Sequence, residues 1–74
     1  MNQYIWVVSR GTESSKATTI LGIFPCGLES QNYVLARDSS VVAQQTDFES
    51  TNEFILCGEW FIYKIVKVFN GFYK

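Results

Sequence analysis

The sequence predicts a small α+β domain of ββαββ order, in which an antiparallel sheet of four to five strands packs against one helix. Four runs of β-branched and aromatic residues, at 4–8, 18–24, 53–57 and 60–69, indicate the strands. The segment 26–38, between the second and third runs, combines apolar spacing with terminal charges that favour a helix. With 74 residues, 47% of them hydrophobic, the chain suits a single domain with a thin core.

Turn residues bound the first two predicted strands. Residues 4–8 are apolar throughout, which suits contact on both faces, and residues 9–11 follow with turn chemistry. The polar residues 12–16 form the expected hairpin loop. The second strand should stop at Pro25, which cannot donate a backbone hydrogen bond, and Gly22 within it marks a bulge or a close backbone approach.

The segment 26–38 admits two interpretations. Pro25 near the first turn, Glu29 near the positive end and Arg37 near the negative end favour a helix. Tyr33, Leu35 and Arg37 also alternate as a strand would. If the segment were a strand, the domain would become a small all-β barrel.

The C-terminal half predicts a polar loop followed by a hairpin. Residues 41–52 offer one large apolar side chain, Phe48. The strands at 53–57 and 60–69 are separated by Gly58 and Glu59, which predict a two-residue turn. Alternation puts one lysine on each face of 60–69, which suggests a partly open sheet edge or lysines that reach water; an open edge would permit a homodimer by sheet extension.

The residue inventory excludes most catalytic designs, so we expect no enzyme and no catalytic residue. The chain has no histidine, and its two cysteines are too few for a zinc site or a disulfide framework. Phosphate-binding glycine loops are also missing, so no cofactor and no metal are expected. Two chemical alternatives stay open. Cys26, at the start of the predicted helix, could carry a reactive thiol, whereas Cys57 in an apolar strand should simply pack. Asp47 and Glu49 could form a pair of catalytic carboxylates.

The candidate partner-binding residues lie in an acidic stretch. Residues 38–59 contain five acidic residues and no base, whereas lysines follow after residue 60. An acidic surface would steer the domain to a partner protein with a basic surface, and an aromatic residue within it would anchor the interface. The predicted site comprises Asp47, Phe48, Glu49, Glu53 and Glu59. The alternative is that the acidic residues belong to a solvated loop without a partner and that Phe48 pins this loop to the core.

A nucleic-acid-binding module is the alternative function. Aromatic and lysine side chains on 60–69 could stack and neutralise a single strand. The net charge of −1 makes direct nucleic acid binding the less favoured prediction.

No membrane association is expected. The apolar run 60–69 is too short to span a bilayer and contains two lysines. The first residues lack the pattern of a secretory signal, so we expect a reducing, cytoplasmic location.

The order of these segments resembles small ββαβ accessory proteins of bacteriophages. The resemblance covers about three-quarters of the chain and is carried by its hydrophobic layout: Tyr4-Ile-Trp-Val-Val-Ser, Ile20-Leu-Gly-Ile-Phe-Pro, Asn32-Tyr-Val and Trp60-Phe-Ile-Tyr-Lys-Ile. The loop at 41–52 and the added hairpin depart from that pattern. The resemblance implies a phage-encoded inhibitor that sterically blocks a host or bacterial-defence protein, such as restriction or CRISPR machinery.

Overall fold

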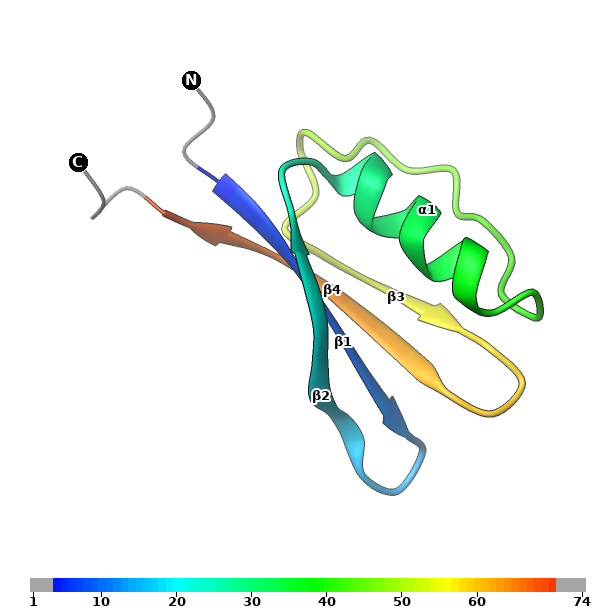
Figure 1. Cartoon of the computed structure of the whole chain (residues 1–74). Coiled ribbons are helices and arrows are strands. Elements are labelled where there is room, and N and C mark those ends of the chain that lie inside the picture. Colours follow the sequence, from blue (N-terminus) through cyan, green and yellow to red (C-terminus); the bar gives the residue numbers. More distant parts are fainter. Residues whose placement is uncertain (1–3, 71–74) are drawn as a thin grey trace.

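The computed structural model describes residues 4–70 and has the predicted ββαββ order (Figure 1). Its elements are β1 (Tyr4–Thr12), β2 (Lys16–Phe24), α1 (Gly27–Arg37), β3 (Glu53–Cys57) and β4 (Ile62–Phe69). All strand pairs are antiparallel, and the sheet order is β2-β1-β4-β3. The sheet stays open and α1 packs on one face, so the α+β prediction is confirmed and the all-β barrel is excluded.

The strand at 60–69 does not lie at an edge of the sheet. β4 pairs with β1 on one side and with β3 on the other, whereas β2 and β3 form the edges. The expectation of an open edge at 60–69 is therefore wrong. Its two lysines have another explanation: Lys64 forms an ion pair with Glu53, and the Lys67 ammonium lies over the rings of Tyr4 and Trp6.

The first hairpin is longer than the sequence predicts. β1 continues through residues 9–11, which were expected to form a turn, and the chain reverses after Thr12. Register shifts between Val8 and Ser9 and between Arg10 and Gly11 interrupt the pairing with β2. The first shift lies beside Gly22, the position predicted for a bulge, and β2 ends immediately before Pro25.

The core lies between α1 and the face of the sheet that it covers. Alternate residues of the strands, among them Trp6, Val8 and Ile65, point toward the helix and are buried. From α1, Val34 is fully buried against them. Glu29 in the first turn and Arg37 in the last complement the helix dipole as predicted.

The second hairpin turns one residue later than predicted. The Gly58 backbone N–H donates to the Phe61 carbonyl at 2.8 Å, so Glu59 and Trp60 occupy the tip instead of Gly58 and Glu59. Trp60 is thus a turn residue, not a strand residue. The alternation predicted for the rest of the strand holds, because Tyr63 and Ile65 are buried on the helix side.

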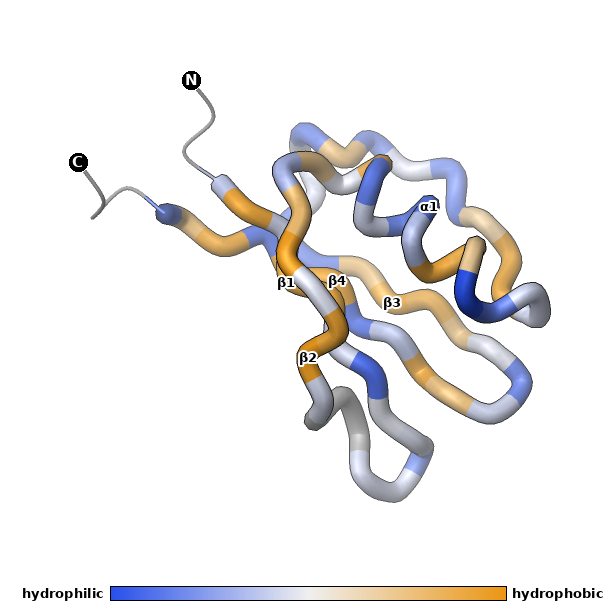
Figure 2. Tube along the Cα trace, viewed as in Figure 1, coloured by the Kyte–Doolittle hydropathy of each residue, from blue (hydrophilic) through white to orange (hydrophobic). Residues whose placement is uncertain are grey.

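Within residues 4–70, α1 covers one face of the sheet and no helix lies on the opposite face (Figure 1). Figure 2 shows the hydropathy of the strands, in which apolar residues alternate with charged and polar residues along the trace. Registration of β1 with its neighbours places Val7 beside Ile23 and Val66, and Ile5 beside Val68. We call this surface the open face. No helix within residues 4–70 has the length and apolarity needed to cross a membrane.

Candidate functional site

The loop after α1 is fixed by its own polar groups around Asp47. One carboxylate oxygen of Asp47 accepts from the backbone N–H of Glu49 at 3.1 Å, and the other accepts from the Ser50 hydroxyl at 2.9 Å. The Thr51 hydroxyl donates to the Asp47 carbonyl at 2.7 Å. The Asp47 side chain therefore shapes the loop, and its oxygens are already engaged.

Phe48 pins the loop to the core. Its ring centroid lies 5.1 Å from that of Phe54 and 6.5 Å from that of Trp6, the latter edge-on. It also lies against Gly27 at the start of α1, where a Cβ atom would come within 2.7 Å of the ring. Phe48 is half-buried. These contacts correspond to the alternative that the sequence left open, a side chain that anchors the loop.

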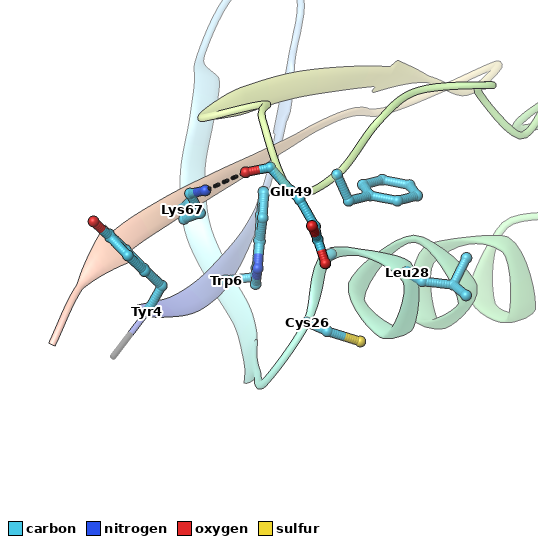
Figure 3. A pocket seen from close by; sticks show the side chains of 8 residues that line it. Tyr4, Trp6, Cys26, Leu28, Glu49 and Lys67 are labelled. Atoms are coloured by element: carbon cyan, nitrogen blue, oxygen red, sulfur yellow. Dashed lines mark hydrogen bonds between the residues drawn. The ribbon is translucent and has the colours of Figure 1, made fainter. Parts of the chain in front are cut away.

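A groove of about 460 Å³ opens beside Phe48, between the first turn of α1 and the ends of β1 and β4 (Figure 3). The rings of Tyr4 and Trp6 form one wall, and Cys26 and Leu28 approach from the helix. The Lys67 ammonium donates to the Glu49 carbonyl at 2.9 Å and lies 4.9 Å from the centre of the Tyr4 ring. Lys67 thus closes the groove against the loop.

The predicted acidic residues do not form one patch. Asp47 and Glu49 lie in the loop near the groove, exposed to solvent. Glu53 lies on the open face, where its carboxylate is 3.0 Å from the Lys64 ammonium. Glu59 lies at the tip of the second hairpin, beyond the far end of β3. Whether these side chains bind a partner stays a prediction.

The tip of the second hairpin forms a separate acidic and aromatic surface. Trp60 is 76% exposed. It lines a hollow of about 260 Å³ together with Glu59 and with Glu13 from the neighbouring hairpin, whose tip lies at the same end of the sheet (Figure 1). We call Glu13, Glu59 and Trp60 the hairpin-end surface. Sequence reasoning missed this grouping because it placed Trp60 within a strand.

A polar network locks the hairpin end to the end of α1. Asp38 accepts from the Tyr63 hydroxyl at 2.8 Å and from the side chain and backbone N–H of Ser40. The Ser40 hydroxyl in turn accepts from the Glu59 backbone N–H at 2.7 Å. Gly58 packs so closely that a Cβ atom there would lie 2.5 Å from the Asp38 carboxylate. The backbone that presents Trp60 is therefore held in place.

This network also shifts two titrations. The Ser40 hydroxyl, followed by the Tyr63 hydroxyl, holds the pKa of Asp38 below its ordinary value of 3.8. Burial, reinforced by the hydrogen bond to Asp38, raises the pKa of Tyr63 to about 12. Both shifts favour the pair in which Asp38 is ionised and Tyr63 keeps its proton.

The remaining chemical candidates are dispersed. Cys26 is half-buried at the start of α1, and Cys57, which was expected to pack in the core, is exposed; both are free thiols. Within residues 4–70, no three cysteine, aspartate or glutamate side chains gather as metal ligands would. The carboxylate of Asp47 accepts hydrogen bonds from the Glu49 backbone N–H and the Ser50 hydroxyl, and a carboxylate pair of Asp47 and Glu49 stays a prediction.

Comparison of the chain with protein-family models, curated proteins and solved structures found no match.

Proposed function

We propose that the chain is a non-catalytic protein-binding domain that contacts a basic surface of its partner through the hairpin-end surface. The observation that carries the proposal is the exposure of Trp60 on a hydrogen-bonded turn, beside Glu59 of the same turn and Glu13 of the neighbouring hairpin. Tryptophan is enriched among the residues that dominate binding energy, and a turn fixed before binding loses little conformational entropy. The side chain is thus suited to enter a pocket on another protein.

The charges at this end set the kind of partner. Glu59 and Glu13 are both exposed and line the same hollow as Trp60. Carboxylates at an interface rim speed the approach of a basic partner and disfavour an acidic one. Asp47 and Glu49, at the other end of the sheet, would add to the long-range attraction without contacting the same pocket.

The resemblance to bacteriophage accessory proteins suggests the biological setting of the proposal. The partner would be a host or bacterial-defence protein with a basic groove, and binding would block that groove sterically in the bacterial cytoplasm. No cofactor and no reaction are required for this action.

The test is capture of the partner from bacterial lysate with the intact chain as bait. Wild type should retain a partner that Trp60→Ala loses, and Glu59→Lys should slow association at low salt. Val42→Ala is the matched control, because Val42 is 80% exposed but lies in the loop after α1. Equal capture by Trp60→Ala and wild type would contradict the proposal.

A nucleic-acid-binding module remains the second candidate because of one cluster at the groove. The rings of Tyr4 and Phe69 are 5.5 Å apart, both are exposed, and the Lys67 ammonium lies over Tyr4. An exposed ring beside a cation can stack a nucleobase. A gel-shift titration with single-stranded oligonucleotides separates the candidates: salt-sensitive binding that Tyr4→Ala abolishes would support the module.

A further inference from the structure

We propose that the open face of the sheet is an interface at which two copies of this chain stack sheet against sheet. The proposal concerns a surface on the opposite side of the sheet from α1, and it goes beyond the protein-binding function proposed above. Three observations on residues 4–70 carry it: the composition, the extent and the charge of the face.

The open face has the composition of a buried surface. Ile20 is 67% exposed, Ile23 is 60% exposed and Ile55 is 46% exposed, and all three lie on edge strands where their side chains point away from α1. Val7 and Val66 fill the centre between them, directly opposite each other in the register of β1 and β4. Such β-branched side chains favour a pleated surface that is covered, and monomeric proteins rarely expose apolar patches larger than a few hundred Å².

The face has the extent of a small dimer interface. Its four strands contain five to nine residues each, and at about 3.3 Å per residue and about 4.8 Å between strands they cover roughly 500 Å². Interfaces of this size lie at the low end of the range for specific contacts, which suits association at micromolar concentration. Sheets that stack face to face lie about 10 Å apart, with side chains of the two inner faces interdigitating. Four strands from each copy would then form a sandwich with the helices outside.

The charges of the face favour a second copy of the chain over a partner whose surface is strongly acidic or strongly basic. Among the described side chains of the open face, Glu53 and Lys64 are the ionised ones, and they pair at 3.0 Å. A surface with one charge of each sign is neutral as a whole and complementary to itself. A two-fold axis running across the strands would set Glu53 of each copy near Lys64 of the other, as an isologous interface requires.

Sedimentation velocity of the full chain tests the proposal. Wild type should move from the 8.5 kDa monomer toward twice that mass as its concentration rises through the micromolar range. Ile23→Glu and Ile20→Glu should each weaken self-association tenfold or more, because each buries an unpaired charge at the interface. Leu28→Glu is the matched control, since Leu28 is 53% exposed but lies on α1.

A mixing experiment identifies the surface. Glu53→Lys leaves two positive charges on the face and Lys64→Glu leaves two negative charges, so each variant alone should dimerise less than wild type. Mixed together, the two variants should form a heterodimer more readily than either forms a homodimer. Loss of the Glu53–Lys64 ion pair within one chain would not produce this recovery.

Two results would overturn the proposal. A wild-type chain that stays monomeric at the highest soluble concentration would show that the face meets another occupant or none. A dimer that Leu28→Glu abolishes and Ile23→Glu leaves intact would place the contact on the helical side.

Discussion

Two glycines in this fold are required by what touches them. At Gly27, a Cβ atom would lie 2.7 Å from the ring of Phe48 and 3.0 Å from its Cβ, which cannot move without displacing the loop. At Gly58, the nearest atom would be a carboxylate oxygen of Asp38, which is held by Tyr63 and Ser40. In both places a loop or turn packs directly against backbone. The missing side chain is what lets α1 and the second hairpin be fastened to their neighbours.

The packing at Gly27 predicts that Gly27→Ala has a different effect on the free energy of unfolding in wild type and in a Phe48→Ala background. Gly27→Ala should destabilise the wild type by about 1–3 kcal/mol, because overpacking forces the Phe48 ring outward. In a Phe48→Ala background the same change should be neutral or stabilising by up to about 1 kcal/mol, since alanine is the better helix former. Urea unfolding of the four proteins of this double-mutant cycle measures both values. Equal destabilisation in the two backgrounds would mean that Phe48 does not occupy the space over Gly27.

The Asp38–Tyr63 pair predicts a loss of stability at high pH. The pKa of Tyr63 is raised from its ordinary 10.0 to about 12 in the folded chain, so the unfolded chain loses this proton first. Its contribution is fully present below pH 10 and declines as the pH rises from 10 through about 12. Unfolding midpoints across that range should fall less steeply for Tyr63→Phe than for wild type. Tyr33→Phe, which leaves the Asp38 bond intact, should keep the wild-type slope.

The acid side of the same pair behaves in the opposite sense. Because the pKa of Asp38 is lowered in the folded chain, its contribution is present above about pH 3.8 and is lost as the pH falls through the lower folded value. In Asp38→Asn, the free energy of unfolding should therefore fall less steeply than in wild type as the pH is lowered below about 3.8. Asp47→Asn provides the comparison at another loop carboxylate. A fall as steep as that of wild type in Asp38→Asn would contradict this assignment.

At the scale of elements, the strands and helix follow from local pattern, and the loop does not. The spacing of apolar residues predicted β3 at 53–57, and the charges of Glu29 and Arg37 marked the helix within one residue at each end. The second turn was predicted one residue too early, because Trp60 suits a strand as well as a tip. The hydrogen bond from the Gly58 backbone N–H to the Phe61 carbonyl places Glu59 and Trp60 at the tip. The apolar alternation of the strand does not determine which residues form this bond.

The path of the loop after α1 depends on hydrogen bonds between two residues that are distant in the sequence. The side-chain amide of Gln31, buried in α1, accepts from the Gln44 backbone N–H at 3.0 Å and donates to the Gln44 carbonyl at 3.5 Å. The Gln44 side chain then donates to the Ile55 carbonyl on β3. The segment that the sequence predicted as an exposed loop is thus fastened to the helix and to an edge strand. The loop therefore also covers part of the free backbone edge of β3.

Removal of the Gln31 amide should free this loop without unfolding the domain. Gln31→Ala is expected to cost about 0.5–1.5 kcal/mol, because the Gln44 backbone loses a hydrogen-bond partner at an exposed position where water can replace it. The amides of Gln44 and its neighbours should then exchange hydrogen faster, while β1 and β4 keep their protection. Gln45→Ala provides the control at an exposed neighbour. Uniform acceleration across the sheet would instead show that the loop and the core unfold together.

At the scale of the whole molecule, the apolar run at 4–8 predicted contact on both faces of the first strand, and the fold supplies cover for one. Trp6 and Val8 lie under α1, whereas Ile5 and Val7 face the other way. The predicted site was dispersed for a related reason. Alternation along β3 puts Glu53 on the open face, while the length of the strand separates Glu49 from Glu59. Neither outcome could be derived from charge counts along the sequence.

Stacking of two open faces predicts a thermal stability that depends on protein concentration. Association of folded chains shifts unfolding by mass action, so the midpoint of wild type should rise as the concentration rises. Ile23→Glu should remove that dependence while changing the midpoint of the dilute monomer little, because a surface substitution on an exposed edge costs about 0.5 kcal/mol or less. Calorimetric scans of both proteins over a wide concentration range provide the measurement. A concentration-independent midpoint in wild type would contradict the stacking, and would mean that the isoleucines and valines of the open face meet water in the isolated chain.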